Sequence, residues 1–169
     1  FHFNNVWTAL SETFPDRPAL VCEDKTVTWS HFNERAARLA GLFSENGVTN
    51  GASVGMYMLN CNEYTEAHFG CFKQSVCPVN VNYRYRAEEL IYLLDNSDAE
   101  VVIYHASYAP RIAEIRDSLP KIKLYIQVED ESGNPLLAGA LDYETALAES
   151  TPLAFTPSAY DDRYMLYTG

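Results

Sequence analysis

Apolar positions in the first part of the chain switch from helical spacing to alternation and back to helical spacing. Within residues 3–14 they recur every three or four positions, which predicts a helix stopped by Pro15. Two short apolar runs around a polar turn predict a β-hairpin over residues 18–29. A longer helix should follow, with Ser30 as its N-terminal cap and Gly47 just past its end. The apolar stripes consist of Val6, Trp7, Leu10 and Phe14 in the first helix and of Phe32, Ala36, Leu39 and Phe43 in the second.

The middle of the chain alternates between strand and helix patterns. Apolar runs predict strands, and the stretches between them predict helices, the first of which Asn62 should cap. The strands are expected at residues 53–59, 77–81, 100–104 and 123–128, and the helices at residues 62–74, 87–96 and 108–119. A strand, a helix and a strand in succession favour a parallel pair with a right-handed crossover. The sequence therefore predicts an α/β fold, in which helices flank a mainly parallel sheet.

The C-terminal part of the chain has fewer regular elements. Residues 129–135 are polar and predict a surface loop, and Asp142 should cap a short helix. Two prolines mark residues 150–159 as an extended connector, and residues 164–167 predict one more strand. Because a core strand at a chain end is unusual, we expect the sequence to be truncated there.

Composition and charge narrow the class of protein. With 47% hydrophobic residues, the chain is able to form a core that excludes water. A net charge of −11 opposes binding to nucleic acid or to anionic membranes. No apolar run approaches the ~20 residues of a membrane span. The four cysteines form neither a C-x-x-C pair nor a zinc-binding pattern, so we expect buried free thiols and a reducing, cytoplasmic location.

Residues with catalytic chemistry are sparse. The four histidines have neither metal-binding nor triad spacing, and the common nucleotide-binding and nucleophile motifs are missing from the sequence. Tyr83, Tyr85 and Tyr92 form an aromatic group that we expect to pack against the sheet rather than to line a pocket. We therefore predict no catalytic residue and no metal ligand in this chain.

Four stretches in a fixed order carry a family resemblance. They are Pro15–Leu20 with Val27–Phe32, Gly47–Asn60, Pro78–Arg84 with Glu88–Leu90, and Tyr167–Gly169 after Asp161 and Asp162. Together the stretches resemble the N-terminal region of the adenylate-forming (AMP-binding) superfamily, which includes acyl-CoA synthetases, peptide-synthetase adenylation domains and firefly-type luciferases. The chain departs from the pattern at residues 50–53, where many members have an acidic residue. The resemblance implies that residues 1–169 are the first half of the large N-terminal domain of a bacterial-type fatty-acyl-CoA synthetase, truncated at the phosphate loop.

The resemblance also implies a reaction and its cofactors. Such enzymes use ATP and Mg²⁺ to activate a carboxylic acid as an acyl-adenylate and then transfer the acyl group to CoA. Thr168 and Gly169 match the entry to the phosphate loop, where backbone N–H groups and hydroxyls bind the phosphates of ATP. A glycine at this position also occurs in bacterial synthetases that act on steroid side-chain acids, which points to a fatty or steroid acid as substrate. Most catalytic residues of the family lie further along the chain, so we expect this chain alone to be inactive.

Arg84 ends the Asn-x-Arg stretch, and the resemblance implies that it contacts a phosphate of the CoA nucleotide. Arg86 and Lys73 are close to it in the sequence, which makes this a basic region of an acidic chain. A guanidinium is able to bind a phosphate through two parallel hydrogen bonds. The alternative is a structural role, in which Arg84 and Arg86 pair with Glu88, Glu89 or backbone carbonyls.

Other functions stay open on the sequence alone. The chain could belong to an adenylation domain that loads a carrier-protein thiol, to a non-catalytic α/β binding or regulatory module, or to a truncated paralogue that pairs with a full-length partner. A Gly/Ser/Thr-rich coding sequence after Gly169, with a Pro-Lys pair, would support the enzyme. If the chain exposes apolar edges, we expect it to form a homodimer or to be poorly soluble when it is expressed alone.

Overall fold

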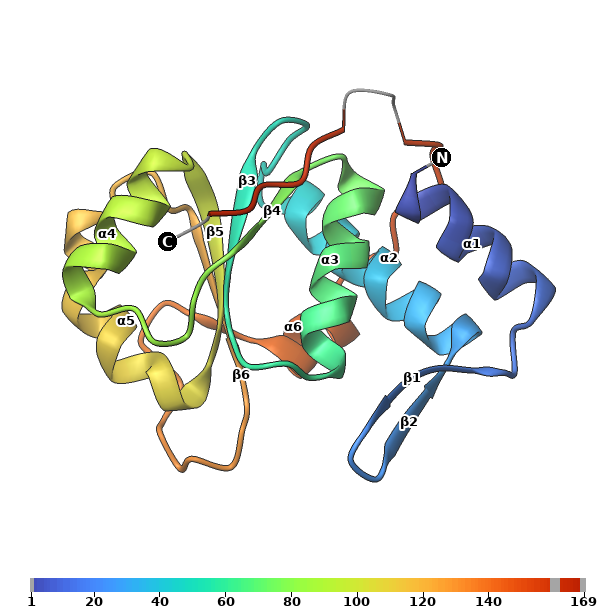
Figure 1. Ribbon diagram of the computed structural model, residues 1–169, viewed down its shortest axis with the longest axis horizontal. Helices are drawn as coiled ribbons and strands as arrows, with labels where there is room; N and C mark the ends of the chain where they lie inside the picture. The colour runs from blue at the N-terminus through green and yellow to red at the C-terminus, as the bar shows by residue number, and fades with distance from the viewer. Residues whose placement is uncertain (1, 159–161, 168–169) are drawn as a thin grey trace.

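A parallel β-sheet occupies the centre of the molecule. The computed structural model describes residues 2–158 and 162–167. The strand order is β4-β3-β5-β6-β7, and each strand runs parallel to its neighbours (Figure 1). The strands are β3 (Ser53–Tyr57), β4 (Cys77–Asn80), β5 (Ala99–His105), β6 (Leu124–Val128) and β7 (Leu141–Asp142). The predicted α/β fold with a parallel sheet is therefore confirmed, while β7 is a short edge strand that the sequence did not predict.

Helices cover both faces of the sheet. In Figure 1, α4 and α5 lie on one side of the sheet, and α2, α3 and α6 lie on the other, with α1 outermost. The helices are α1 (Phe3–Thr13), α2 (Trp29–Glu45), α3 (Asn62–Gln74), α4 (Ala87–Asn96), α5 (Ala109–Ile115) and α6 (Tyr143–Glu149). Short 3₁₀ turns at Ala106–Tyr108 and Arg116–Ser118 extend α5 at both ends, and β1 (Pro18–Cys22) and β2 (Lys25–Thr28) form the predicted hairpin. In the described part of the chain, no helix is long and apolar enough to cross a membrane.

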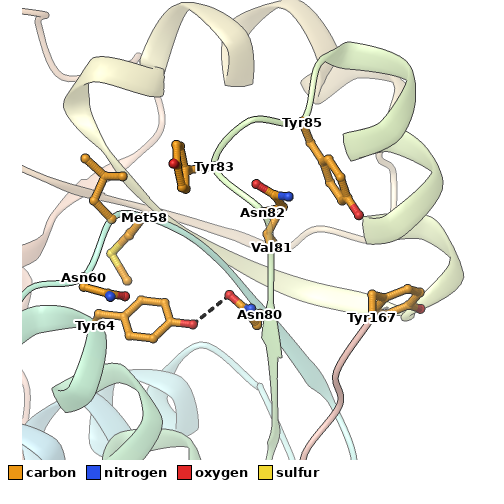
Figure 2. Close-up of a pocket in the computed structure, with 10 residues that line it drawn as sticks. Met58, Asn60, Tyr64, Asn80, Val81, Asn82, Tyr83, Tyr85 and Tyr167 are labelled. Carbon is orange, nitrogen blue, oxygen red and sulfur yellow. Dashed lines mark hydrogen bonds between the residues drawn. The ribbon is translucent and has the colours of Figure 1, made fainter. Parts of the chain in front are cut away.

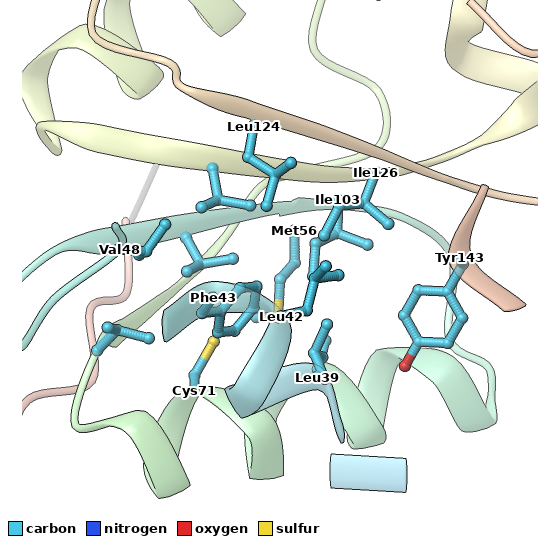
Figure 3. Packing of buried hydrophobic residues seen from close by; sticks show 14 of the residues in the cluster. Leu39, Leu42, Phe43, Val48, Met56, Cys71, Ile103, Leu124, Ile126 and Tyr143 are labelled. Carbon is cyan, nitrogen blue, oxygen red and sulfur yellow. The ribbon is translucent and has the colours of Figure 1, made fainter. Parts of the chain in front are cut away.

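The core is divided by the sheet into two apolar layers. Along β5, Val101 and Ile103 pack toward α2 and α3, whereas Val102 and Tyr104 pack toward α4 and α5. Successive side chains of a strand point to opposite faces, so a sheet that is covered on both faces needs continuous apolar strands. Figure 3 shows the first layer, in which Phe43 of α2 meets the sheet. Burial on both faces explains why apolar runs were sufficient to locate β3, β5 and β6.

Two glycines allow elements to approach closely around α2. A Cβ atom at Gly70 of α3 would lie 2.9 Å from Cδ2 of Leu39, so the small residue lets α3 pack tightly on α2. A Cβ atom at Gly41 would clash with the carbonyl oxygen of Thr151. The connector after α6 therefore crosses α2 at a position where a side chain larger than glycine would force the backbone apart.

The predicted N-terminal cap of α2 is wrong by two residues. The helix begins at Trp29, and Thr28 is the cap, since its Oγ1 accepts a hydrogen bond from the backbone N–H of His31 at 3.3 Å. Thr28 has the extended backbone that a cap requires, and Ser30 lies inside the first turn. The last residue of β2 thus also starts the helix.

The predicted cap of α3 is wrong by one residue. Cys61, with an extended backbone, precedes the helix, and its Sγ accepts a hydrogen bond from the backbone N–H of Tyr64 at 3.3 Å. Asn62 is the first helical residue. A thiol is a weak acceptor and gives little sequence signal as a cap, which explains the displacement.

The strand predicted at residues 164–167 is reduced to one parallel bridge. The bridge joins Met165 to Val79 at the outer edge of β4, and the backbone N–H of Met165 donates to the carbonyl of Pro78 at 3.1 Å. Pro78 has no N–H to donate, so β4 offers a poor edge for further pairing.

All four cysteines are free thiols, as predicted. Cys71 and Cys77 are buried, but Cys22 and Cys61 are only half-buried, so the expectation of full burial is wrong for these two. Cys22 ends a strand of the partly exposed hairpin, and Cys61 lies in the turn between β3 and α3.

Candidate functional site

A recess of about 590 Å³ opens at the carboxyl ends of β3 and β4. We call it the carboxyl-edge recess (Figure 2). It is lined by Met58, Leu59, Asn60, Tyr64, Asn80, Val81, Asn82, Tyr83, Tyr85 and Tyr167. These residues come from the turn after β3, from the start of α3, from the segment after β4 and from the C-terminal segment. Residues distant in the sequence thus meet at one edge of the sheet.

The topology of the sheet explains the position of this recess. The chain leaves β3 into α3 on one face and leaves β4 into α4 on the opposite face (Figure 1). Where neighbouring strands connect to opposite faces, the two loops diverge and leave a crevice outside the carboxyl ends of the strands. Ligands of open α/β sheets bind in such crevices. In the strand order β4-β3-β5-β6 the switch point falls between β3 and β5, so the carboxyl-edge recess lies directly beside the position that the fold favours for a ligand.

The polar groups of the carboxyl-edge recess are uncharged phenols and amides. The hydroxyl of Tyr64 donates a hydrogen bond of 2.7 Å to Oδ1 of Asn80 (Figure 2). Burial raises the pKa of Tyr64 to about 12, so its hydroxyl keeps its proton at neutral pH. Asn60 and Asn82 add further amides to the wall. The recess is thus equipped to orient a polar ligand through hydrogen bonds.

A buried histidine fixes one wall of this recess. Nδ1 of His105, at the end of β5, accepts a hydrogen bond from the backbone N–H of Leu59 at 3.1 Å, and its Nε2 lies 3.6 Å from Sγ of Cys61. Burial lowers the pKa of His105, which favours the neutral imidazole that accepts at Nδ1. Sequence analysis missed this link, because only the pairing of β3 with β5 brings the two residues together.

The segment after β4 is held rigidly beside the recess. The carbonyl of Tyr85 accepts hydrogen bonds from the hydroxyl of Tyr57 at 2.9 Å and from Nη1 of Arg111 at 3.2 Å. Oδ1 of Asn82 accepts a hydrogen bond from the backbone N–H of Arg84 at 3.0 Å, which closes a local turn. The segment therefore presents its side chains in a defined orientation.

Arg84 lies on the far side of this segment, in a second recess of about 340 Å³. We call it the arginine recess; its lining residues are Tyr57, Tyr83, Arg84, Tyr85, Arg86, Ser107, Tyr108, Pro110, Arg111 and Glu114. Nε of Arg84 donates to the hydroxyl of Tyr83 at 3.2 Å. Within residues 2–158 and 162–167, no carboxylate forms an ion pair with Arg84, and Glu89 instead accepts from the backbone N–H of Arg86 at 2.8 Å.

The tyrosine group does not behave as one unit. Tyr83 and Tyr85 line both recesses, and Tyr85 also packs against the core layer under α4 and α5. Tyr92 is exposed on α4. The expectation that these rings pack against the sheet is therefore wrong for Tyr83, which is exposed in the segment after β4, and for Tyr92, which lies on the exposed face of α4.

The predicted phosphate-loop residues, Thr168 and Gly169, lie outside the described residues. Tyr167, which directly precedes them, lines the carboxyl-edge recess and donates a hydrogen bond of 2.7 Å from its hydroxyl to Oδ1 of Asn96 on α4. The expected contact of Thr168 and Gly169 with the phosphates of ATP stays a prediction, as does the expected contact of Arg84 with CoA.

The fold is that of an α/β protein with a recess at the carboxyl edge of a parallel sheet. The sequence profile of the AMP-binding enzyme family matches residues 7–169, and the chain belongs to this family. It is 43% identical to the medium-chain acyl-CoA ligase Mig of Mycobacterium avium, over 95% of this chain and 32% of that protein. It is 41% identical to the 3-oxocholest-4-en-26-oate–CoA ligase of Rhodococcus rhodochrous, over 92% of this chain and 28% of that protein. The chain thus spans about a third of the length of the curated relatives that it matches.

Solved structures show the same architecture. The structure of a protein described as a putative long-chain-fatty-acid CoA ligase from Rhodopseudomonas palustris superposes with a TM-score of 0.86 at 26% identity, over 99% of this chain and 42% of that chain. The anthranilate CoA ligase AuaEII, solved with anthranoyl-AMP, also gives a TM-score of 0.86, at 22% identity over 96% of this chain and 31% of that chain, which shows the shared fold. The predicted family and fold are confirmed.

Proposed function

We propose that this chain is the N-terminal part of an ATP-dependent acyl-CoA ligase that acts on a fatty or steroid side-chain acid. The observation that carries the proposal is the identity of 43% and 41%, over more than nine tenths of the chain, to one ligase named for medium-chain acids and one named for a steroid acid. Both relatives are named for joining an acid to CoA, and the carboxyl-edge recess offers a site for an organic ligand.

The proposed reaction has two balanced steps. The carboxylate oxygen of the acid attacks the α-phosphorus of ATP, which forms the acyl-adenylate and releases pyrophosphate. The sulfur of CoA then attacks the acyl carbonyl carbon, which forms the thioester and releases AMP and the thiol proton. Both steps depend on the alignment of the reacting groups, and Tyr64 and Asn80, which are joined by a hydrogen bond, supply fixed hydrogen-bonding groups for that purpose.

Mg²⁺ would offset the charge of the triphosphate in the first step. The described residues contain no group of three or more His, Cys, Asp or Glu side chains that could hold a metal ion. We assign no step on this chain to Mg²⁺, an ion that usually binds through substrate phosphates, waters and one or two carboxylates.

Exchange of labelled pyrophosphate into ATP tests the proposal on the complete protein. The panel should contain medium-chain and long-chain fatty acids and a steroid side-chain acid, with short-chain acids as controls. We expect exchange with at least one fatty or steroid acid, and CoA-dependent thioester formation with the same acid. If no acid supports exchange, the ligase assignment is refuted. If exchange occurs but the acyl group is transferred only to a carrier protein, the acceptor is that protein and not CoA.

Arg84→Ala tests the proposed contact to CoA. Because Arg84 lies in the arginine recess and not in the carboxyl-edge recess, we expect the KM for CoA to rise while pyrophosphate exchange is retained. An unchanged KM for CoA would show that Arg84 does not contact CoA.

A further inference from the structure

One side chain joins the end of β5 to the turn between β3 and α3. His105 is the last residue of β5 and is only 6% exposed. Its Nδ1 accepts a hydrogen bond of 3.1 Å from the backbone of Leu59, and a backbone N–H is able only to donate. The proton of the neutral ring is therefore on Nε2, which lies 3.6 Å from Sγ of Cys61 and donates to it. The imidazole thus holds both ends of the turn formed by residues 59–61.

This turn carries two groups of the carboxyl-edge recess. Asn60 lies at its centre, and Tyr64 follows in the first turn of α3. Sγ of Cys61 caps that helix, since it accepts from the backbone N–H of Tyr64 at 3.3 Å. A shift of the turn would therefore move an amide and a phenol of the recess wall together. Because His105 is not among the described lining residues, it is able to act on a ligand only through the turn.

Protonation of His105 would break the bond that holds the turn. An imidazolium carries an N–H on both nitrogens, so Nδ1 would direct a donor at the N–H of Leu59. That backbone N–H would lose its acceptor, and a buried donor without a partner costs free energy. The turn would have to move until the N–H finds another acceptor. The arrangement in the structure thus requires a neutral imidazole.

The surroundings of the imidazole determine the pH at which this change occurs. Burial is the largest influence and lowers the pKa of His105 below its ordinary value of 6.5, while the carboxylates of Asp130, after β6, and Glu63, on α3, act in the opposite direction. The thiol of Cys61 stays uncharged, because burial raises its pKa to about 12. Since the unfolded chain takes up this proton more readily than the folded chain, the arrangement weakens as the pH falls below 6.5.

We propose that His105 is a positioning residue of the carboxyl-edge recess, and that it holds the turn in its ligand-binding form only while the imidazole is neutral. The proposal rests on the proposed function for the identity of the ligand. We take ATP as this ligand, because Tyr167 lines the recess and directly precedes the predicted phosphate-loop residues. When only a fraction of the molecules has the binding form, the apparent affinity falls by that fraction, and saturating ligand restores the form. His105 should therefore act on the KM for ATP and not on kcat.

Replacement by asparagine separates the hydrogen bond from the titration. In His105→Asn, Oδ1 is able to take the place of Nδ1 as acceptor for the N–H of Leu59, but the amide takes up no proton. Pyrophosphate exchange on the complete protein gives the KM for ATP at pH 7.5 and at pH 5. Between these pH values we expect the KM to rise about threefold more in the wild type than in His105→Asn, with the same change in kcat. The phosphates of ATP also take up protons, but equally for both proteins. The same rise in KM for both would overturn the proposal.

An exposed histidine supplies the control. His31 lies on α2, and its side chain is 55% exposed. His31→Asn removes a titrating imidazole without touching the turn, so the KM for ATP should have the pH dependence of the wild type. A loss of that dependence in His31→Asn would show that it does not come from His105.

Amide hydrogen exchange of the peptide that contains Leu59 is a readout that does not need the ligase reaction. In the complete protein it should be fastest for His105→Leu, which has no acceptor, and at pH 5 it should be faster for the wild type than for His105→Asn. If this pattern occurs without any pyrophosphate exchange, the ligase assignment is refuted and the role of His105 is kept. If pyrophosphate exchange occurs and the amide exchanges equally in all three proteins, only the role of His105 is refuted.

Discussion

Helices α1 and α2 have similar apolar stripes in the sequence but bury different faces in the structure. In α2 the stripe is buried, and Leu39 and Phe43 have no exposed surface. In the α1 stripe, Val6 and Phe14 are exposed by 39% and 47%, and the neighbouring Phe3 by 59%, whereas Trp7 is half-buried against Phe32 and Phe69. The face of α1 that is buried carries the polar residues Asn4, Thr8 and Ser11.

The difference between the two helices comes from what each of them faces. α2 lies against the sheet, where apolar side chains interlock with β3 and β5 (Figure 3). α1 lies outside α2 and α3 and meets the connector that follows α6 (Figure 1). Nδ2 of Asn4 donates to the carbonyl of Thr156 at 3.1 Å and to the hydroxyl of Ser158 at 3.0 Å. A stripe thus predicts that a helix forms, but its neighbours decide which face is buried.

Replacing one large apolar residue of each stripe with alanine should give the largest difference in unfolding free energy between the two helices. Leu39→Ala leaves a cavity between α2 and α3 and should cost about 3 to 4 kcal/mol of unfolding free energy. Phe14→Ala removes a half-exposed ring and should cost less than about 1 kcal/mol. Urea unfolding of the 169-residue chain measures both values. Similar costs for the two variants would mean that α1 buries its stripe in solution.

Elements that depend on local pattern were predictable, and contacts between distant segments were not. Residues 87–96 were predicted as a helix, and α4 has these bounds. The spacing of its apolar residues and the glutamates of its first turn both indicate a helix there. Arg84 was found as a site candidate from its motif. The partners that complete the two recesses, such as Arg111 and His105, come from later strands and helices, and only the strand order of the sheet places them there.

The buried polar face of α1 should be the next most sensitive feature. Asn4→Ala leaves the Thr156 carbonyl and the Ser158 hydroxyl without their bonds to Asn4, so we expect a loss of about 2 kcal/mol. Thr13→Ala, at an exposed position of the same helix, is the control and should change stability by less than about 0.5 kcal/mol. Hydrogen exchange of the connector amides should increase in Asn4→Ala alone. Unchanged exchange would mean that the connector is held by other contacts.

The buried ammonium of Lys73, on α3, makes the stability of the region where α1 packs depend on pH. Its ammonium lies 4.2 Å from the centre of the Phe69 ring and 3.4 Å from the hydroxyl of Thr8 on α1, and burial lowers its pKa from 10.5 to about 8. Between these two pH values the unfolded chain binds more protons than the folded chain, so stability rises with pH across this window and is lowest below pH 8.

Lys73→Met removes the burial cost of the charge but also the contact with the aromatic ring. We expect a net gain of about 1 to 2 kcal/mol at pH 7 and loss of this part of the pH dependence. Urea unfolding at pH 7, 9 and 10.5 measures the change, and Lys25→Met on the exposed hairpin is the control. A destabilised variant at pH 7 would show that the contact with Phe69 outweighs the cost of burial.

The smallest effect on stability should come from the exposed stripe of α1, where a change in association is expected instead. Phe3→Ser with Val6→Ser removes two exposed apolar side chains that help to line a recess of about 430 Å³ and should shift the unfolding free energy by less than about 1 kcal/mol, mainly through the loss of the contact between Phe3 and Phe72. We expect the 169-residue chain to self-associate in sedimentation velocity through this surface, and the double variant to sediment as a monomer. Tyr92→Ser, at a position of α4 that is 66% exposed, is the control for a distant apolar residue and should leave association unchanged. If the parent chain is a monomer that unfolds cooperatively on heating, the exposed apolar residues of α1 do not cause association, and the predicted homodimer is wrong.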